Sequence, residues 1–281
     1  RFASDAALTP ALYSVHEEWA REAHRLGWST VKVAEEAIID LGDLAFKGKK
    51  FQDVRTAFNH AKREGIRAEW ASYPSLSSQL RQQVDAICQA WADEKALPEM
   101  GFTLGGLREI NDSDTRLLLA LDEEERIHAV TSWMPVHSGG KVIGLTLDVM
   151  RRDDSGFHLA IDFLIGQAAL LAQDEGLQFI SLSGAPLAES GQCEESAELA
   201  DSRFAFASVL DVMGSVMEPV YGFRSLLAYK KKFQVRFVPL YLAIPDIANA
   251  PAVGLAIAHA YLPNMSAASA VGVAAKLVSR D

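Results

Sequence analysis

The sequence has little cysteine and no long hydrophobic run. Its 281 residues include two cysteines, Cys88 and Cys193, which excludes a disulfide framework and favours a reducing compartment. No apolar stretch approaches the ~20 residues that a membrane-spanning helix needs, and the first residues show no signal-peptide pattern. An apolar content of 49% with 23% charged residues is instead typical of a globular protein with a large core.

The common catalytic motifs are also absent. The sequence contains no GxSxG, HExxH, CxxC or Walker-type GxxxxGK[ST]. The seven histidines show no ligand spacing, so we expect no structural metal. The glycine-rich segment Gly101–Gly106 is weak evidence for phosphate binding.

Charge is unevenly distributed. A net charge of −10 argues against a nucleic-acid partner, but Lys47–Arg67 holds seven basic residues against two acids, and Arg224–Arg236 holds five against none. The acids concentrate in Glu123–Glu125 and Glu189–Asp201. Local fields steer polyanions, although an ordinary solvated surface explains such runs equally well.

The stretch from Val142 to Gln178 predicts a βαβ crossover. Val142–Met150 alternates as a strand does, Phe157–Glu175 is apolar nearly all round, and Leu177–Leu182 reads as a second strand. A helix of that kind packs on a sheet. We therefore expect a parallel strand pair covered by a buried helix.

A carboxylate and an arginine lie at the end of the first strand of this crossover. Asp148 is near the end of the apolar strand, where a carboxylate is costly to bury without a partner, and Arg151 follows it. Such a pair suits group transfer from or to an anionic molecule. A salt-bridged strand end is the structural alternative.

A second cationic cluster comprises Lys230, Lys232 and Arg236. The pattern predicts a short helix over Tyr221–Phe233 that ends in this cluster. If the backbone is extended at the lysines, Lys230 and Lys232 point at one anionic group and Lys231 points elsewhere. On a helix the three cations fan out over about 200° and the distinction blurs. A solvated lysine face is the alternative.

Elsewhere the pattern predicts mixed α/β structure with a boundary near residue 100, giving domains 1–100 and 101–281. We expect helices at Leu8–Gly27, Leu80–Trp91 and Arg203–Met217, and a hairpin at Arg116–Pro135. Another helix has Val54, Ala57, Phe58 and Ala61 on one side and the basic residues Arg55, Lys62 and Arg63 on the other.

Several segments resemble one known family. LTLDVMRR, YGFRSLLAYKKKFQVRFVPL and FKGKKFQDVRTAFNHAKREGI are similar to the cytosolic C-terminal domain of bacterial phosphatidylglycerol lysyltransferases, the aminoacyl-phosphatidylglycerol synthases. The similarity covers Ala37 to Pro245. Its most specific pieces are D-x-M-R at Asp148–Arg151, G-x-P-L at Gly184–Leu187 and Y-K-x-K-F at Tyr229–Phe233.

The resemblance implies tandem acetyltransferase-like (GNAT) folds, with mixed sheets flanked by helices and the transfer site in the C-terminal one. It also implies an aminoacyl-tRNA donor, an acceptor that is phosphatidylglycerol or a related lipid, and no cofactor. In the family this domain follows a membrane-spanning region and works at the cytoplasmic face of the bacterial cell membrane.

Site roles follow from the same resemblance. Asp148 would orient the amino acid's ammonium group or accept a proton, and Arg151 would meet the lipid phosphate or the tRNA 3′ end. The expected substrate-binding residues are Lys230, Lys232, Arg236, Ser183 and Gly184, and the peripheral tRNA-binding candidates are Arg55, Lys62 and Arg63.

Two other classes remain open. One is a GNAT-type acyltransferase acting on a soluble amine or a peptidoglycan precursor, which bound acyl-CoA would identify. The other is a non-catalytic tRNA- or lipid-binding module, expected if Asp148 is locked in a structural ion pair.

Overall fold

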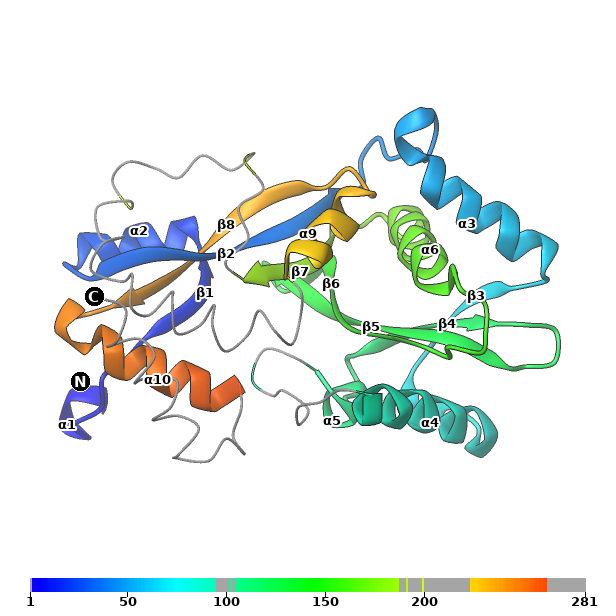
Figure 1. Cartoon of the computed structure of the whole chain (residues 1–281). Helices are drawn as coiled ribbons and strands as arrows, with labels where there is room; N and C mark the ends of the chain where they lie inside the picture. The colour runs from blue at the N-terminus through cyan, green and yellow to red at the C-terminus, as the bar shows by residue number, and fades with distance from the viewer. Residues whose placement is uncertain are drawn as a thin grey trace. The chain divides into compact units, whose positions relative to one another are not determined.

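A computed structural model (Figure 1) describes residues 2–94, 102, 105–186, 191, 199 and 223–261. The backbone forms two compact units. The first unit comprises residues 1–36, 184–227 and 237–281, and the second comprises 37–183 and 228–236. The units interleave along the chain, whereas the sequence predicts a single boundary near residue 100. Backbone compactness is a different criterion from a repeat of two folds, so the division into 1–100 and 101–281 stays a prediction.

The sheet is mixed. Its strands are hydrogen-bonded in the order β1-β8-β2-β7-β6-β5-β4-β3; β6 and β7 are parallel, whereas β3, β4, β5 and β6 are joined by antiparallel pairs. Helices flank these strands, which confirms the predicted α/β class with mixed sheets flanked by helices. The strands are β1 (Leu12–His16), β2 (Ser29–Asp40), β3 (Arg67–Ala71), β4 (Arg116–Leu121), β5 (Ile127–Ser138), β6 (Lys141–Arg152), β7 (Phe179–Pro186) and β8 (Arg236–Ile244).

The helices fall into a longer and a shorter group. The longer ones among those described are α2 (Glu17–Arg25), α3 (Gln52–Arg63), α4 (Ser78–Glu94), α6 (Ala160–Asp174), α9 (Phe223–Lys231) and α10 (Ala250–Tyr261), and the short ones are α1 (Phe2–Asp5) and α5 (Leu107–Ile110). In the described part of the chain, no helix combines the length and the apolar character that crossing a membrane requires. The predicted helix Arg203–Met217 lies outside the described residues.

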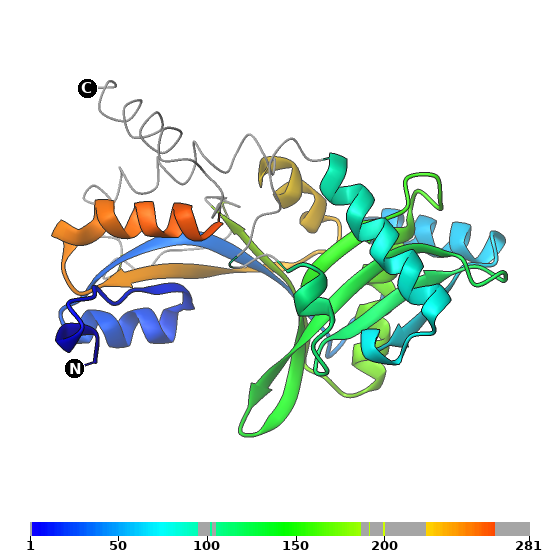
Figure 2. The same cartoon turned by 90° about the horizontal axis from the view of Figure 1, so that it is seen from below.

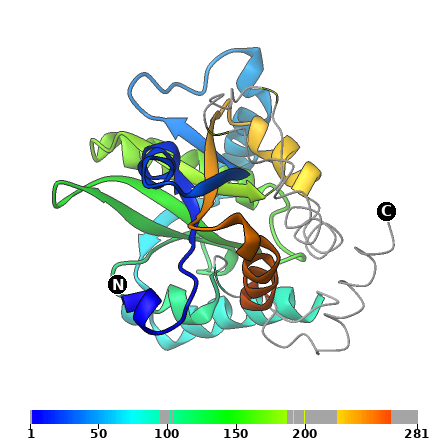
Figure 3. The same cartoon turned by 90° about the vertical axis from the view of Figure 1, so that its left-hand side faces the viewer.

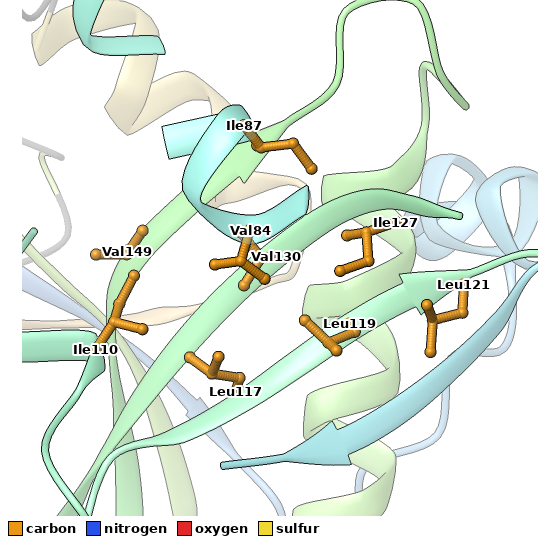
Figure 4. Packing of buried hydrophobic residues seen from close by; sticks show 9 residues of the cluster. All are labelled: Val84, Ile87, Ile110, Leu117, Leu119, Leu121, Ile127, Val130 and Val149. Atoms are coloured by element: carbon orange, nitrogen blue, oxygen red, sulfur yellow. The ribbon is translucent and has the colours of Figure 1, made fainter. Parts of the chain in front are cut away.

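In the second unit, α4 covers one face of the strands and α6 with α3 covers the other (Figures 1 and 2). Alternate residues of β4 face α4, as the period of a strand requires. Figure 4 shows this core, which consists of Val84, Ile87, Ile110, Leu117, Leu119, Leu121, Ile127, Val130 and Val149. Each such side chain contributes roughly 1.5–3 kcal/mol through burial, so this face is rigid where it supports β6.

Helix α6 is buried on several sides because it lies between the sheet and α3. A Cβ added at Gly166 would come within 2.7 Å of the Phe58 ring on α3, so glycine permits the close approach of the two helices. The phenyl rings of Phe58 and Phe163 pack edge to face, 6.1 Å apart. The predicted βαβ crossover, β6–α6–β7, is confirmed.

In the first unit, α2 and α10 lie on opposite faces of β1, β8 and the start of β2 (Figures 2 and 3). The prediction of one helix from Leu8 to Gly27 is wrong, because Leu12–His16 forms strand β1 and the helix begins at Glu17. Strand β1 pairs antiparallel with β8, and this tertiary pairing outweighs the helical spacing of the apolar residues. Strand β2 is continuous over its 12 residues.

Candidate functional site

Strand β6 has a bulge at the predicted acid. Asp148 and Val149 together lie opposite the single residue Ser132 of β5, and the Val149 amide donates to Ser132 Oγ at 2.9 Å. Val149 packs in the core with Ile110 of α5, while Asp148 reaches Gly105 just before α5. The consecutive residues Asp148 and Val149 therefore both contact the segment from Gly105 to Ile110. In a strand with strict alternation, consecutive side chains would point to opposite faces of the sheet. A bulge re-aims side chains in this way.

The Asp148 carboxylate is only partly satisfied. Its Oδ1 accepts a hydrogen bond from the Gly105 amide at 2.9 Å, while its Oδ2 is buried and has no hydrogen-bond partner in the described part of the chain. Burial raises the pKa of Asp148 above its usual value, Glu109 raises it further, and the Gly105 amide and Arg151 oppose the shift. A buried carboxylate with an unused oxygen is costly, and such groups are typical of functional sites.

Arg151 is fixed by an aromatic ring. Its Cζ atom lies 3.2 Å from the ring centroid of Trp91, in the last turns of α4. A guanidinium stacked in this way gains about 0.5–2 kcal/mol and has its plane fixed. The sequence predicts Trp91 only as the last residue of a helix, so its contact with Arg151 was missed.

The lysine cluster begins in a helix. Lys230 and Lys231 form the end of α9, which confirms the short helix predicted to end in the lysine cluster; β8 starts only at Arg236. Lys230 is 3% exposed and its ammonium group donates to the Ser183 carbonyl at 2.9 Å. Lys231 is exposed. Lys230 and Lys231 therefore differ in burial even though both lie in a helix.

Lys232 and Arg236 both have acidic neighbours. Lys232 Nζ lies 3.3 Å from Asp162 Oδ2 in the first turn of α6 and 4.8 Å from the ring centroid of Tyr229. Burial, followed by the Asp162 carboxylate, raises the pKa of Tyr229. Arg236 donates from Nε and Nη2 to the two oxygens of Asp40, at 3.0 and 2.8 Å, in an exposed pair. A phosphate bound here would compete with these carboxylates.

Ser183 is hydrogen-bonded both to Lys230 and to the strand that carries Asp148. Its φ of 64° is in the left-handed region, which strains a residue with a side chain. Its amide donates to Ser181 Oγ at 3.0 Å, and its hydroxyl donates to the carbonyl of Leu147. Lys230 is therefore linked through Ser183 to the backbone of Leu147, the residue before Asp148.

Gly184 lies close to the side chain of Leu240 in the first unit. A Cβ added there would lie 3.3 Å from Leu240 Cδ1, a tight contact. An added side chain would therefore require Leu240 to move by a few tenths of an ångström.

The three tRNA-binding candidates share the exposed side of α3. Arg55, Lys62 and Arg63 are all exposed, and Val54, Ala57 and Ala61 on the opposite side are buried, as predicted. Arg55 also lines a surface pocket of about 330 Å³, together with Gln52, Thr56, Phe58 and Asn59. Within the described residues, no three His, Cys, Asp or Glu side chains gather as metal ligands would.

The comparison with known families decides the identity. The family described as "Phosphatidylglycerol lysyltransferase, C-terminal" matches residues 1–244. The chain belongs to this family. Its D-x-M-R motif is therefore the segment that carries the bulge and the partly satisfied carboxylate of Asp148.

Relatives extend well beyond this chain. An uncharacterized protein of Corynebacterium glutamicum is 44% identical over 93% of the chain, and the lysylphosphatidylglycerol biosynthesis bifunctional protein LysX of Nocardia farcinica is 27% identical over 94%. The chain spans 32% and 23% of the length of these two proteins.

Two solved structures share the fold. These are L-PGS from Bacillus licheniformis, at 22% identity with a TM-score of 0.74, and the C-terminal domain of a putative lysylphosphatidylglycerol synthetase from Agrobacterium fabrum, at 20% with 0.74. They cover 92% and 94% of this chain, which in turn covers 75% and 76% of theirs.

Proposed function

We propose that this domain transfers an amino acid from aminoacyl-tRNA to the headgroup hydroxyl of phosphatidylglycerol. The hydroxyl oxygen attacks the ester carbonyl, the bond from that carbon to the tRNA 3′-terminal ribose oxygen breaks, and the hydroxyl proton ends on the tRNA oxygen. One ester replaces another, so the reaction needs no separate energy source. Membership of the family supports this reaction, and the related proteins named for lysylphosphatidylglycerol synthesis support the lipid acceptor.

The observation that carries the proposal is the unused Oδ2 of Asp148. An incoming ammonium group or hydroxyl would supply the hydrogen bond that this oxygen lacks. Because burial raises the pKa of Asp148, the carboxylate is a better base than an exposed one. Asp148 therefore orients the amino acid's ammonium group or accepts the hydroxyl proton.

Cations around the acid would hold the anionic parts of the substrates. Arg151, with its plane set by Trp91, suits the bidentate recognition of a phosphate. Lys232 and Arg236 are the other phosphate ligands, and they would exchange their carboxylate partners for the phosphate. Lys230, being buried, acts through the Ser183 carbonyl and thus supports the Ser183–Gly184 substrate contact.

We further propose that a membrane-spanning region precedes this domain in the full-length protein and that the reaction takes place at the cytoplasmic face of the cell membrane. The lipid acceptor resides in that membrane, and the chain spans only 23–32% of the related proteins cited above. The domain would therefore be one part of a larger enzyme.

The direct test incubates the protein with charged tRNAs, one amino acid at a time, and phosphatidylglycerol vesicles, followed by mass spectrometry of the lipids. We expect one aminoacyl-phosphatidylglycerol species. A parallel reaction with acetyl-CoA and soluble amines tests the acyltransferase alternative. Acetylated amine without aminoacyl lipid would contradict the proposal, and tRNA binding without any product would identify a binding module.

The basic face of α3 gives a prediction about salt. Binding through phosphates releases counterions, so changing Arg55, Lys62 and Arg63 to Ala should weaken tRNA binding and flatten the plot of log affinity against log salt by about 2 to 3 units of slope. Filter binding between low and physiological salt measures this. The matched control changes three other exposed cations, Arg21, Arg25 and Lys141, and should leave the slope nearly unchanged. Equal effects in both triple variants would indicate net charge rather than a defined surface.

The stacking of Arg151 on Trp91 predicts a difference between two substitutions. Trp91→Phe keeps a ring beneath the guanidinium, whereas Trp91→Ala removes it, so Ala should lower kcat/KM roughly 3- to 30-fold and Phe considerably less. Steady-state kinetics with thermal denaturation as a check on folding measure the difference. Equal losses for Phe and Ala would mean that indole packing, rather than the cation–π contact, is what matters.

A further inference from the structure

Gly105 makes an unusually close approach to Asp148. Its amide bonds to Oδ1 at 2.9 Å, and a Cβ added at this glycine would lie 1.6 Å from Oδ2 and 2.3 Å from Cγ. No side chain can occupy that position while the carboxylate stays in place. The φ of Gly105 is outside the left-handed region, so the backbone conformation does not require glycine there. The close approach to the carboxylate is what excludes every other residue.

The segment that carries Gly105 is anchored on its other side. The next amide, of Gly106, donates to Glu109 Oε2 at 2.9 Å and so closes the first turn of α5. Ile110 at the end of α5 is fully buried in the core with Val149 of the bulge. The amide of Gly105 is therefore held at a fixed place relative to β6, and the carboxylate is fixed with it.

We propose that Gly105 is a positioning residue for Asp148: its amide fixes Oδ1, and its bare Cα packs on Oδ2, so the carboxylate keeps one orientation and is shielded from bulk water. The inference rests on the proposed function, in which Asp148 contacts the substrate. The oxygen that lacks a hydrogen bond lies against Gly105, so a substrate group that bonds to it enters beside this glycine. A residue that only completed a turn would have no influence on how Asp148 titrates.

The test compares Gly105→Ala in the wild-type protein and in an Asp148→Ala background. In the wild type, the new methyl group displaces the carboxylate, and we expect kcat to fall tenfold or more and the melting temperature to drop. In the Asp148→Ala background the three atoms nearest the new methyl group are gone, so Gly105→Ala should change neither the residual activity nor the melting temperature. Gly42→Ala is the control, because its added Cβ meets no atom within 4 Å, and it should keep activity within about twofold.

A pH profile supplies a second measurement. The Gly105 amide lowers the pKa of Asp148 against the effect of burial, so losing that bond should move the acidic limb of the kcat/KM profile to higher pH. Should Gly105→Ala unfold the protein, recovery of the melting temperature in the Asp148→Ala background still shows that the clash is with this carboxylate.

The outcomes separate the two proposals. Full activity of Gly105→Ala beside an inactive Asp148→Ala overturns the inference and leaves the proposed function intact. Equal losses in both backgrounds also overturn it, since Gly105 would then act independently of Asp148. Full activity of Asp148→Ala would remove Asp148 from the proposed mechanism, and the inference would fall with it.

Discussion

Replacing Asp148 by asparagine should lower the rate of aminoacyl transfer by on the order of a hundredfold or more while the protein stays folded. The amide is isosteric with the carboxylate and can still accept the Gly105 hydrogen bond, but it neither takes up a proton nor pairs with an ammonium group. Lipid mass spectrometry over time, with charged tRNA in excess, measures the rate. The change therefore tests the chemistry of the carboxylate with little change in its shape.

A matched control uses another aspartate of the second unit. The Asp112 carboxylate accepts the Asp114 amide in an exposed turn, so Asp112→Asn should keep activity within about twofold. Near-normal transfer by Asp148→Asn would exclude Asp148 from the mechanism. Loss of folding by that variant would instead indicate a structural role.

The same substitution predicts how stability depends on pH. The pKa of Asp148 is raised in the folded protein, so the folded state holds this proton more tightly than the unfolded state does. The wild type therefore loses stability as pH rises from the unfolded pKa through the folded pKa, and the Asn variant has no such loss. The free energy of unfolding of Asp148→Asn minus that of the wild type should accordingly increase between pH 4 and pH 7. A difference that does not vary with pH, measured by chemical denaturation, would mean that the pKa is not raised.

Local pattern was enough to predict most of the second unit. Alternation defined the β4–β5 hairpin and β6, and the apolar surface of α6 required a sheet and a second helix to cover it. The pattern failed at Leu12–His16 because Tyr13 and Val15 suit a strand as well as a helix face. Their pairing with β8, more than 200 residues later in the chain, decides between the two.

The sequence suggested the charged residues of the candidate site, which stay a prediction, and gave no sign of the residues that contact them. Asp148 and Arg151 could be recognised because a carboxylate at the end of an apolar strand needs an explanation. Ser132, Trp91 and Gly105 carry no such signal, since serine, tryptophan and glycine each have ordinary structural uses. Their role depends on tertiary contacts with β6, and the bulge at Asp148 and Val149 has no local signature in the sequence.

In the lysine cluster, too, the contacts depend on tertiary structure that the sequence pattern does not reveal. The contact of Lys230 leads to a prediction about stability. Removing the Lys230 side chain takes away packing and leaves the Ser183 carbonyl without this donor. Lys230→Ala should lower the free energy of unfolding by about 2–4 kcal/mol. Lys230→Met, which keeps the length of the side chain without its charge, should cost about 1–3 kcal/mol. Lys231→Ala should stay within about 0.5 kcal/mol, because that residue is exposed. Urea denaturation of the three variants measures these differences.

Kinetics on alanine variants of the three lysines show whether the position of each lysine matters or only its charge. Lys230→Ala and Lys232→Ala should each cost about 1.5–3 kcal/mol of transition-state stabilisation, measured from kcat/KM. For Lys230→Ala the cause is the lost support of the Ser183 carbonyl, and for Lys232→Ala it is a lost phosphate contact. Only Lys230→Ala should combine that loss with reduced stability, because Lys232 is half-exposed beside Asp162. Lys231→Ala removes the same charge from an exposed neighbour and should leave kcat/KM within about twofold. Equal kinetic losses at all three positions would show that the cluster acts as a diffuse electrostatic field, since a geometric role requires Lys230 and Lys231 to differ.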